Sequence, residues 1–182
     1  MENIYKDFDY KLKPWKHQIK AMKKANLATG FAYFMEQGTG KTKTVLDESQ
    51  IMAHKRMITR VFILCPKSLM GTWKDEIMTH CTNYKIEIWK DKKIYGEGNL
   101  VYNIINIDAI RLTKGLEWAS PRVNRKTLLI LDESQAIKNI KAKRTTVALK
   151  LSREAGYRRI LTGTPITKNV LDVFSQMLFT NP

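Results

Sequence analysis

The sequence predicts an α/β domain with a mostly parallel central sheet and helices on both faces. Short apolar runs alternate along the chain with stretches of helical period, which indicates strands and helices in turn. Glycines, hydroxyl groups or carboxylates directly follow several runs, as they do at the carboxyl ends of parallel strands. With 182 residues, 43% of them hydrophobic, the chain can bury one core, so we expect a single domain over residues 1–182.

The strands are predicted from short apolar runs that end at turn residues or charges. The first comprises Phe31 to Met35 and leads into a glycine-rich loop. The others are predicted at Val61 to Cys65, Lys85 to Lys90, Leu100 to Asn106, Leu128 to Leu131 and Tyr157 to Thr162. Between two of them, Lys90 to Gly98 is expected to form a basic turn.

The helices are predicted from apolar residues that recur at helical spacing. The first contains Ile19, Met22 and Ala25 and ends near Gly30. The second follows the glycine-rich loop and places on one face Val45, Leu46, Ser49, Met52 and Ala53. Later helices are expected from about Ser68 (with Leu69, Trp73 and Ile77), at Asn106 to Arg111, at Thr145 to Leu151, and near the end (Val170, Leu171, Phe174, Met177 and Leu178). Gly115 to Lys126 has no clear period.

The glycine-rich stretch Glu36 to Thr44, EQGTGKTKT, predicts a site for a polyphosphate. Glycines let backbone N–H groups surround phosphates, and the N-terminus of the following helix adds partial positive charge. Lys41 can reach the outer phosphates, and the Thr42 hydroxyl can bind Mg²⁺. The pattern G-x-x-x-x-G-K-[ST] is incomplete, because Met35 stands where its first glycine belongs. The alternative is a glycine-capped loop followed by a solvated lysine.

Two carboxylates, Asp132 and Glu133, directly follow the apolar run Leu128 to Leu131. Mg²⁺ prefers oxygen ligands and retains several waters, so Asp132 can hold the metal directly or through water. Glu133 can orient or deprotonate an attacking water. An ordinary turn or helix cap is the alternative, but a phosphate loop requires a metal-holding carboxylate from another strand. We therefore predict that Lys41 and Asp132 meet across neighbouring strand tips.

Three further segments suggest binding roles, each with a structural alternative. In Leu12 to Gln18, Trp15 could stack on a purine that Gln18 reads, or Trp15 could pack in the core while Gln18 caps its own helix. Lys67 and Ser68 follow a strand, where open α/β sheets bind ligands, although Ser68 could simply cap a helix. The turn Thr162 to Pro165 could sense a neighbouring site or only join a strand to a helix.

The composition suggests a polyanionic partner and an intracellular protein. Lys and Arg number 32 against 17 Asp and Glu, a formal net charge of +15 that favours nucleic acid over a merely solvated basic surface. Cys65 and Cys81 lack metal-binding spacing and are interpreted as reduced thiols, with Cys65 in the core. The first residues are charged where a signal peptide is apolar, and no run is long enough to span a membrane. We expect a cytoplasmic protein, or a nucleoid or nuclear one.

Together the motifs resemble the first RecA-like lobe of a superfamily-two helicase, most closely the Swi/Snf family of DNA-translocating ATPases. The resemblance extends from Pro14 to Pro182, and residues 1–30 form a leading segment similar to the adenine-sensing Q motif. The matching segments are the nucleotide loop Glu36 to Thr42, the strand-following segment Val61 to Trp73, the DExx box Asp132 to Asn139 (DESQAIKN) and the coupling motif Leu161 to Asn169 (LTGTPITKN). The sequence departs from the family at Met35, Gln37 and Ser134-Gln135.

The resemblance implies a RecA-like P-loop NTPase lobe that binds Mg-ATP. Lys41 would bind phosphate, Thr42 and Asp132 would hold Mg²⁺, and Glu133 would be the catalytic base. The nucleotide contacts would come from Trp15, Gln18, Gln37, Gly38, Thr39, Gly40, Lys41, Thr42 and Lys43. Gln135 and Thr162 would couple the nucleotide to a nucleic-acid edge formed by Lys67, Ser68, Asn106, Asp108, Thr162 and Thr164.

The implied partner is DNA bound through its backbone without sequence preference, and lysines near 13–24, 90–93 and 138–144 could neutralise its phosphates. An RNA helicase lobe is a second hypothesis, which the DESQ and IKN residues argue against. A non-catalytic nucleic-acid-binding module with a vestigial loop is a third. The residues match only a first lobe, and the family's transition-state arginines come from a second lobe in cis or in trans, so we expect very slow turnover from this chain alone.

Overall fold

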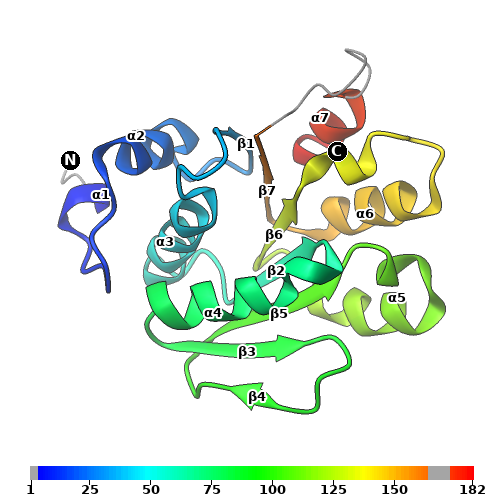
Figure 1. Ribbon diagram of the computed structural model, residues 1–182, viewed down its shortest axis with the longest axis horizontal. Coiled ribbons are helices and arrows are strands. Elements are labelled where there is room, and N and C mark those ends of the chain that lie inside the picture. Colours follow the sequence, from blue (N-terminus) through cyan, green and yellow to red (C-terminus); the bar gives the residue numbers. More distant parts are fainter. Residues whose placement is uncertain (1–3, 164–172) are drawn as a thin grey trace.

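The chain folds around one seven-stranded sheet in the order β1-β7-β6-β2-β5-β3-β4 (Figure 1). The computed structural model describes residues 4–163 and 173–182. The strands are β1 (Gly30–Phe34), β2 (Arg60–Cys65), β3 (Tyr84–Ile88), β4 (Ile94–Tyr95), β5 (Leu100–Asn106), β6 (Thr127–Asp132) and β7 (Tyr157–Thr162). All pairings are parallel except that of β4 with β3. The predicted α/β fold is confirmed.

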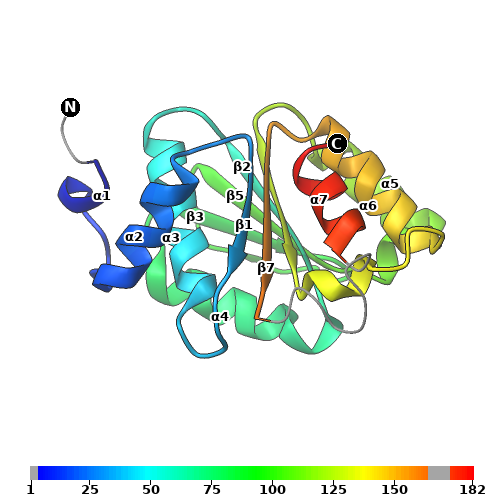
Figure 2. The ribbon, with the colours of Figure 1, turned by 90° about the horizontal axis from the view of Figure 1, so that it is seen from above.

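Helices cover both faces of the sheet (Figure 2). On one face lie α2 (Lys16–Ala25), α3 (Lys41–His54) and α4 (Met70–His80), and on the other α5 (Thr113–Ala119), α6 (Lys143–Glu154) and α7 (Phe174–Thr180). Alternate residues of β2 enter different cores, since Val61 and Ile63 pack on the first face and Phe62 and Leu64 on the second. Continuous apolar strands are expected when a parallel sheet is buried on both sides.

Shorter helical segments complete the described chain. They are α1 (Ile4–Asp7) and four 3₁₀ turns, η1 (Lys67–Leu69), η2 (Ala109–Arg111), η3 (Ser120–Arg122) and η4 (Ser134–Ile137). No helix among the described residues is long and apolar enough to cross a membrane. Both cysteines are free and buried, so the prediction that Cys65 lies in the core is confirmed.

Several sequence-based boundaries were wrong. The first long helix ends at Ala25 rather than near Gly30, because Asn26 and Leu27 adopt left-handed backbone conformations. The predicted turn between Lys90 and Gly98 contains β4. The stretch Gly115 to Lys126, in which no period was recognised, contains most of α5. Of the final predicted helix, Val170 and Leu171 lie outside the described residues.

The predicted one-sided burial of α3 was also wrong. Every residue from Thr44 to Met52 is buried, including the charged Asp47 and Glu48. Glu48 is compensated by Arg159 of β7, whose guanidinium donates to both carboxylate oxygens at 2.6 and 2.9 Å. The Tyr33 hydroxyl of β1 donates to the same carboxylate at 2.9 Å. This buried ion pair joins α3 to both strands beside it.

Arg159→Met should therefore destabilise the domain, because it leaves the Glu48 carboxylate buried without its cation. We expect a loss of about 3–5 kcal/mol in the free energy of unfolding, measured by urea denaturation. The control is Arg153→Met on the exposed surface of α6, expected to change it by less than about 0.5 kcal/mol. Equal effects of the two substitutions would contradict the structural role of the pair.

Candidate nucleotide site and nucleic-acid edge

The glycine-rich loop and the carboxylate pair lie at the same edge of the sheet, because parallel strands end at one edge. They are not on neighbouring strands as predicted, since β7 lies between β1 and β6. Gly163, at the end of β7, touches the loop. A Cβ added there would lie 3.5 Å from the Met35 carbonyl oxygen, 3.6 Å from the Gln37 amide nitrogen and 3.8 Å from Lys41 Nζ. The tip of β7 therefore fills the space between the two motifs.

The loop has the backbone needed to surround an anion. Gly38 and Gly40 have φ values of +80° and +76°, in the left-handed region that other residues rarely adopt. Gly40 is also the N-cap of the 14-residue helix α3. Lys41 Nζ donates to the carbonyls of Met35 at 3.0 Å and Glu36 at 3.1 Å. An ammonium has three donors, so these bonds leave one for a phosphate.

Asp132 is held at the end of β6 by two hydrogen bonds. Trp73 Nε1 donates to its Oδ2 and the Glu133 amide to its Oδ1, each at 2.9 Å. Burial raises the pKa of Asp132; the Trp73 hydrogen bond opposes this rise, the Glu133 charge adds to it, and the Lys41 ammonium opposes it. The influence of Lys41 indicates that the loop and the carboxylates share one electrostatic environment.

Glu133 has an unusual backbone conformation. Its φ of +51° lies in the left-handed region, which costs a residue other than glycine free energy and often marks functional sites. Its side chain accepts a hydrogen bond from Gln135 Nε2 at 2.6 Å, and Gln135 Oε1 accepts one from the Thr162 hydroxyl at 3.0 Å. A hydrogen-bonded chain thus runs from the predicted base to the tip of β7.

Thr162 itself is fully buried in this structure, so its predicted direct contact with nucleic acid is not part of this arrangement and stays a prediction. Only its predicted coupling role, through Gln135, fits the geometry. Thr164 lies outside the described residues.

In the leading segment, the side-chain amide of Gln18 contacts the chain itself, including the glycine-rich loop, and does not face solvent. Gln18 is 2% exposed, and its Oε1 accepts the Trp15 amide at 2.8 Å as part of a helix cap. Gln18 Nε2 lies 3.4 Å from the carbonyl oxygens of both Thr39 and Gly40. Trp15 is 65% exposed and does not pack in the core. Adenine recognition by these two residues therefore stays a prediction.

The ammonium of Lys43 points away from the loop. It donates to the Leu12 carbonyl at 2.9 Å and pairs with Asp47, one turn along α3. Lys43 thereby ties the leading segment to α3, and its predicted nucleotide contact is not part of this arrangement.

Residues predicted to contact nucleic acid meet at the ends of β2 and β5. Lys67, Asn106 and Asp108 line a cavity of about 290 Å³. Ser68 is exposed beside Lys67 within η1, and the N-caps of η1 and α4 are Pro66 and Leu69, so Ser68 is not the helix cap that the alternative required. Asn106 Oδ1 accepts the Ala109 amide at 2.9 Å, which fixes the turn after β5. Asp108 is paired with Arg144 at 3.0 Å, so its charge is compensated within the chain.

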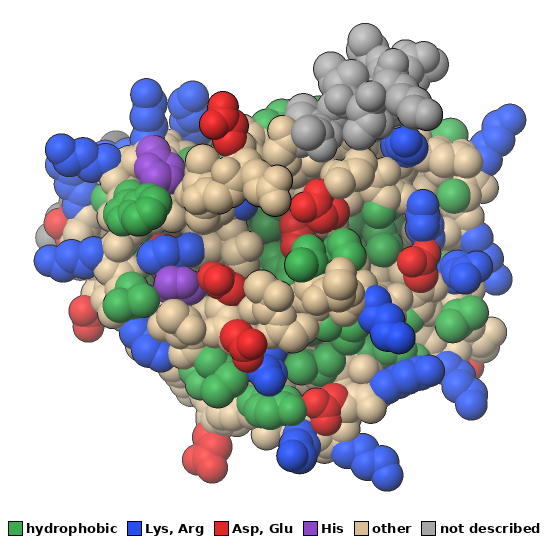
Figure 3. Space-filling view, viewed as in Figure 1, with side chains coloured by type: hydrophobic (Ala, Val, Ile, Leu, Met, Phe, Trp, Pro, Cys, Tyr) green, Lys and Arg blue, Asp and Glu red, His purple; other side chains and the backbone are tan. Residues whose placement is uncertain are grey.

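The sequence predictions did not connect Trp73 with the carboxylates. Trp73 was placed only in a helix and in the segment Val61 to Trp73, although it bonds to Asp132. Lys90 was expected to neutralise DNA phosphates, but it was not connected with Lys67, and neither were Trp89 and Arg111, although all of them line the same cavity. The available signal was Lys90, two residues after Ile88, and Arg111, five residues after Asn106. On the face seen in Figure 3, Lys and Arg side chains gather mainly around the rim, and acidic groups lie nearer the centre.

Residues 22–182 match the sequence profile of the family described as the SNF2-related domain. The chain belongs to the SNF2-related domain family. The matched region contains the loop, the carboxylate pair and Trp73, and it leaves out Trp15 and Gln18. The resemblance to Swi/Snf ATPases is thereby confirmed.

SNF2-family relatives are much longer than this chain. Helicase domino of Drosophila melanogaster is 31% identical over 154 residues, 81% of this chain and 5% of that protein. The DNA repair and recombination protein RAD54B of Homo sapiens is 33% identical over 133 residues, 70% of this chain and 14% of that protein. The chain thus corresponds to a small part of each relative.

Solved structures confirm the RecA-like fold. The Sulfolobus solfataricus SWI2/SNF2 ATPase core in complex with dsDNA has a TM-score of 0.79 at 24% identity, covering 96% of this chain and 37% of that chain. A nuclease-deletion mutant of the Type ISP restriction-modification enzyme LlaGI, in complex with a DNA substrate mimic, has a TM-score of 0.62 at 16% identity, covering 86% and 18% of the two chains.

The SNF2-family site fits a magnesium-bound nucleotide. Among residues 4–163 and 173–182, no three His, Cys, Asp or Glu side chains converge on one point, so the chain alone offers no complete metal cage. Mg²⁺ does not need one, because it is commonly held by one or two carboxylates together with substrate phosphates and water. The donors offered here, the Thr42 hydroxyl and Asp132, match that requirement.

Trp73→Phe tests the bond that positions Asp132. The substitution keeps a buried aromatic ring but removes the N–H donor, so the carboxylate should lose its orientation. We expect the Mg²⁺ concentration that supports half-maximal binding of a fluorescent ATP analogue to rise about tenfold. Trp89→Phe is the matched control, because no hydrogen bond from the Trp89 indole to a carboxylate occurs among residues 4–163 and 173–182. An unchanged Mg²⁺ midpoint in a folded Trp73→Phe protein would show that the indole is only structural.

Proposed function

We propose that this SNF2-family domain is the ATP-binding lobe of a DNA-dependent ATPase of the translocase type. One observation carries the proposal: Lys41 and the Asp132-Glu133 pair lie at one sheet edge, joined through the tip of β7. A basic globular protein without nucleotide chemistry would not need a strained Glu133 backbone beside a glycine-rich loop.

Each residue has a separate task in the proposed reaction. Backbone amides from Gly38 to Thr42 and the free donor of Lys41 bind the phosphates. Thr42 and Asp132 would hold Mg²⁺, which would supply charge neutralisation on the phosphates when bound. Glu133 orients the attacking water and accepts its proton. The hydrogen bonds of Gln135 with Glu133 and with Thr162 couple the orientation of the Glu133 side chain to the end of β7.

Two finer proposals follow for partners. DNA would bind through its backbone at the cavity that contains Lys67, Lys90 and Arg111. A second RecA-like lobe, in cis or in trans, would supply the arginines that stabilise the transferring phosphoryl group. Such arginines contribute roughly 10³ to 10⁵ in rate in related enzymes.

Lys41→Ala should abolish nucleotide binding by the 182-residue chain. We expect the affinity for a fluorescent ATP analogue to fall at least about tenfold, because the phosphates lose the Lys41 ammonium and the Lys43 ammonium is already bound to Leu12 and Asp47. Lys55→Ala, exposed after α3, is the control.

Hydrolysis by the unmodified chain should remain very slow with or without duplex DNA. Unchanged binding in Lys41→Ala, or brisk DNA-stimulated turnover by this chain alone, would contradict the proposal.

The DNA edge is tested by reversing its charges. Lys67→Glu with Arg111→Glu should weaken binding to a fluorescent DNA duplex at least about tenfold and reduce the slope of affinity against salt concentration. Lys55→Glu changes the same charge type away from the cavity and should have a much smaller effect. Equal losses would indicate diffuse attraction to the basic surface. Stronger binding of duplex RNA than of DNA would favour an RNA helicase lobe.

A further inference from the structure

The two ends of the sheet are protected very differently. At one end β4 is only two residues long, follows Lys92 and Lys93, and precedes Gly96 in a left-handed conformation. Short, lysine-flanked edge strands resist pairing with other chains. At the other end β1 has the sequence GFAYF, with neither a charge nor a proline. The β1 edge therefore lacks the usual protection against strand addition.

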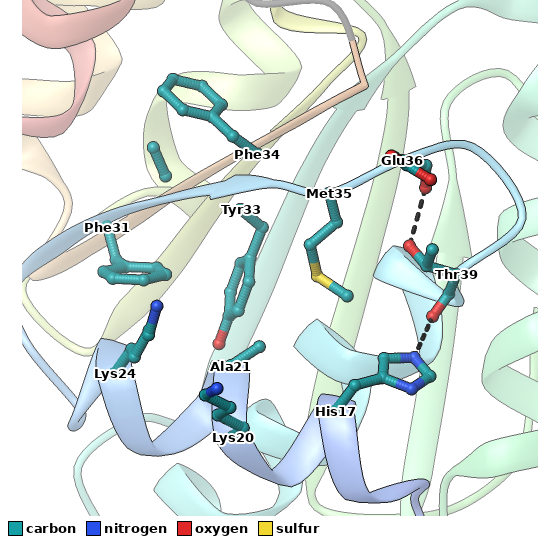
Figure 4. Close-up of a pocket in the computed structure, with 11 residues that line it drawn as sticks. His17, Lys20, Ala21, Lys24, Phe31, Tyr33, Phe34, Met35, Glu36 and Thr39 are labelled. Carbon is teal, nitrogen blue, oxygen red and sulfur yellow. Dashed lines mark hydrogen bonds between the residues drawn. The ribbon is translucent and has the colours of Figure 1, made fainter.

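A cavity of about 510 Å³ lies along this edge (Figure 4). Its lining includes every residue from Phe31 to Glu36. Successive side chains of a strand point to opposite faces, so a cavity that touches consecutive residues must lie along the strand's edge. Figure 4 shows this arrangement, with Phe31 and Tyr33 pointing toward α2 and Phe34 pointing the other way.

Backbone groups of β1 are directed into this space. Gly30 is in register with Arg158, and the Arg158 amide donates to the Thr29 carbonyl at 2.7 Å. Since peptide groups alternate along a strand, Phe31 and Tyr33 bond to β7 while Ala32 and Phe34 face outward. Within the described chain, β7 is the sole strand paired with β1.

The charged side chains around the cavity indicate which kind of ligand it would bind. Lys20 and Lys24 of α2 line it and are exposed, and neither forms an ion pair among residues 4–163 and 173–182. His17 lies on the same helix, and Glu36 is the one acidic residue of the lining. The two lysines are four residues apart, about 6 Å along a helix. On an extended chain, acidic residues at positions i and i+2 are separated by about 6.6 Å, which matches the distance between the two lysines.

We propose that the β1 edge binds an extended acidic segment of a partner polypeptide, which adds a parallel or antiparallel strand beside β1. Its backbone would pair with Ala32 and Phe34. Its acidic residues would alternate with apolar ones, the acids facing Lys20 and Lys24 and the apolar side chains covering Phe34, which is 43% exposed. Backbone pairing supplies affinity in such strand addition, and the alternating side chains supply specificity.

The test uses a fluorescein-labelled peptide, GSVEVEVSG, and the 182-residue chain. We expect saturable binding by fluorescence anisotropy, with slower hydrogen exchange at the amides of Ala32 and Phe34. Lys20→Glu with Lys24→Glu should weaken binding at least about tenfold. Lys23→Glu is the matched control, since it is exposed on the same helix but outside the cavity lining, and it should change the affinity less than about twofold.

Two further probes separate backbone pairing from charge attraction. Ala32→Pro removes an outward amide while keeping the bonds to β7, as edge strands tolerate, and should weaken binding. The second probe uses the unmodified chain and so does not depend on the folding of the Ala32→Pro variant. A peptide N-methylated at alternate residues should fail to bind it. Equal binding of GSVKVKVSG would overturn the proposal. So would displacement of the peptide by ATP, which would assign the cavity to the nucleotide site, or dimerisation of the chain through β1 in sedimentation experiments.

Discussion

The order of three parallel strands is the constraint on which the site depends. Because β7 is inserted between β1 and β6, the loop after β1 and the carboxylates after β6 are separated by one strand width. At the end of β7, Gly163 lies beside the loop and the Thr162 hydroxyl donates a hydrogen bond to Gln135. Hydrogen bonds connect Glu133 to Thr162 through Gln135, which is the path that the proposed coupling would use.

Burial of α3 gives the phosphate loop a rigid base. A helix with its apolar side alone against the sheet could tilt, but α3 is enclosed along nine consecutive residues. The buried Glu48 and Arg159 pair also links it to β7, while Lys43 links it to the leading segment. The same helix begins at Gly40, so these contacts determine where the loop's amides point. Positions remote from the phosphates thus contribute to the binding geometry.

Most strands were predictable because their signal is local. A buried parallel strand is a short apolar run, and β5 and β7 were predicted with their observed boundaries. The motifs at strand ends were also predictable, since Lys41, Asp132 and Glu133 are recognised by their neighbours in the chain. The signal failed where burial depends on distant partners. Nothing near α3 in the sequence indicates that Arg159, 111 positions away, would compensate Glu48. Likewise β4 and α5 have too few apolar residues to show a period.

The fold class, the family and the chemical groups available for nucleotide binding could all be inferred from the amino-acid sequence. These properties follow from residue type, spacing and order, which do not require knowledge of packing. Which of the groups meet became known from the three-dimensional structure. That structure places β7 between the two motifs, bonds Trp73 to Asp132, buries Thr162 and places β1 at the edge of the sheet. Such pairings depend on strand order and on contacts between residues far apart in the chain, and neither is encoded in any short stretch of sequence.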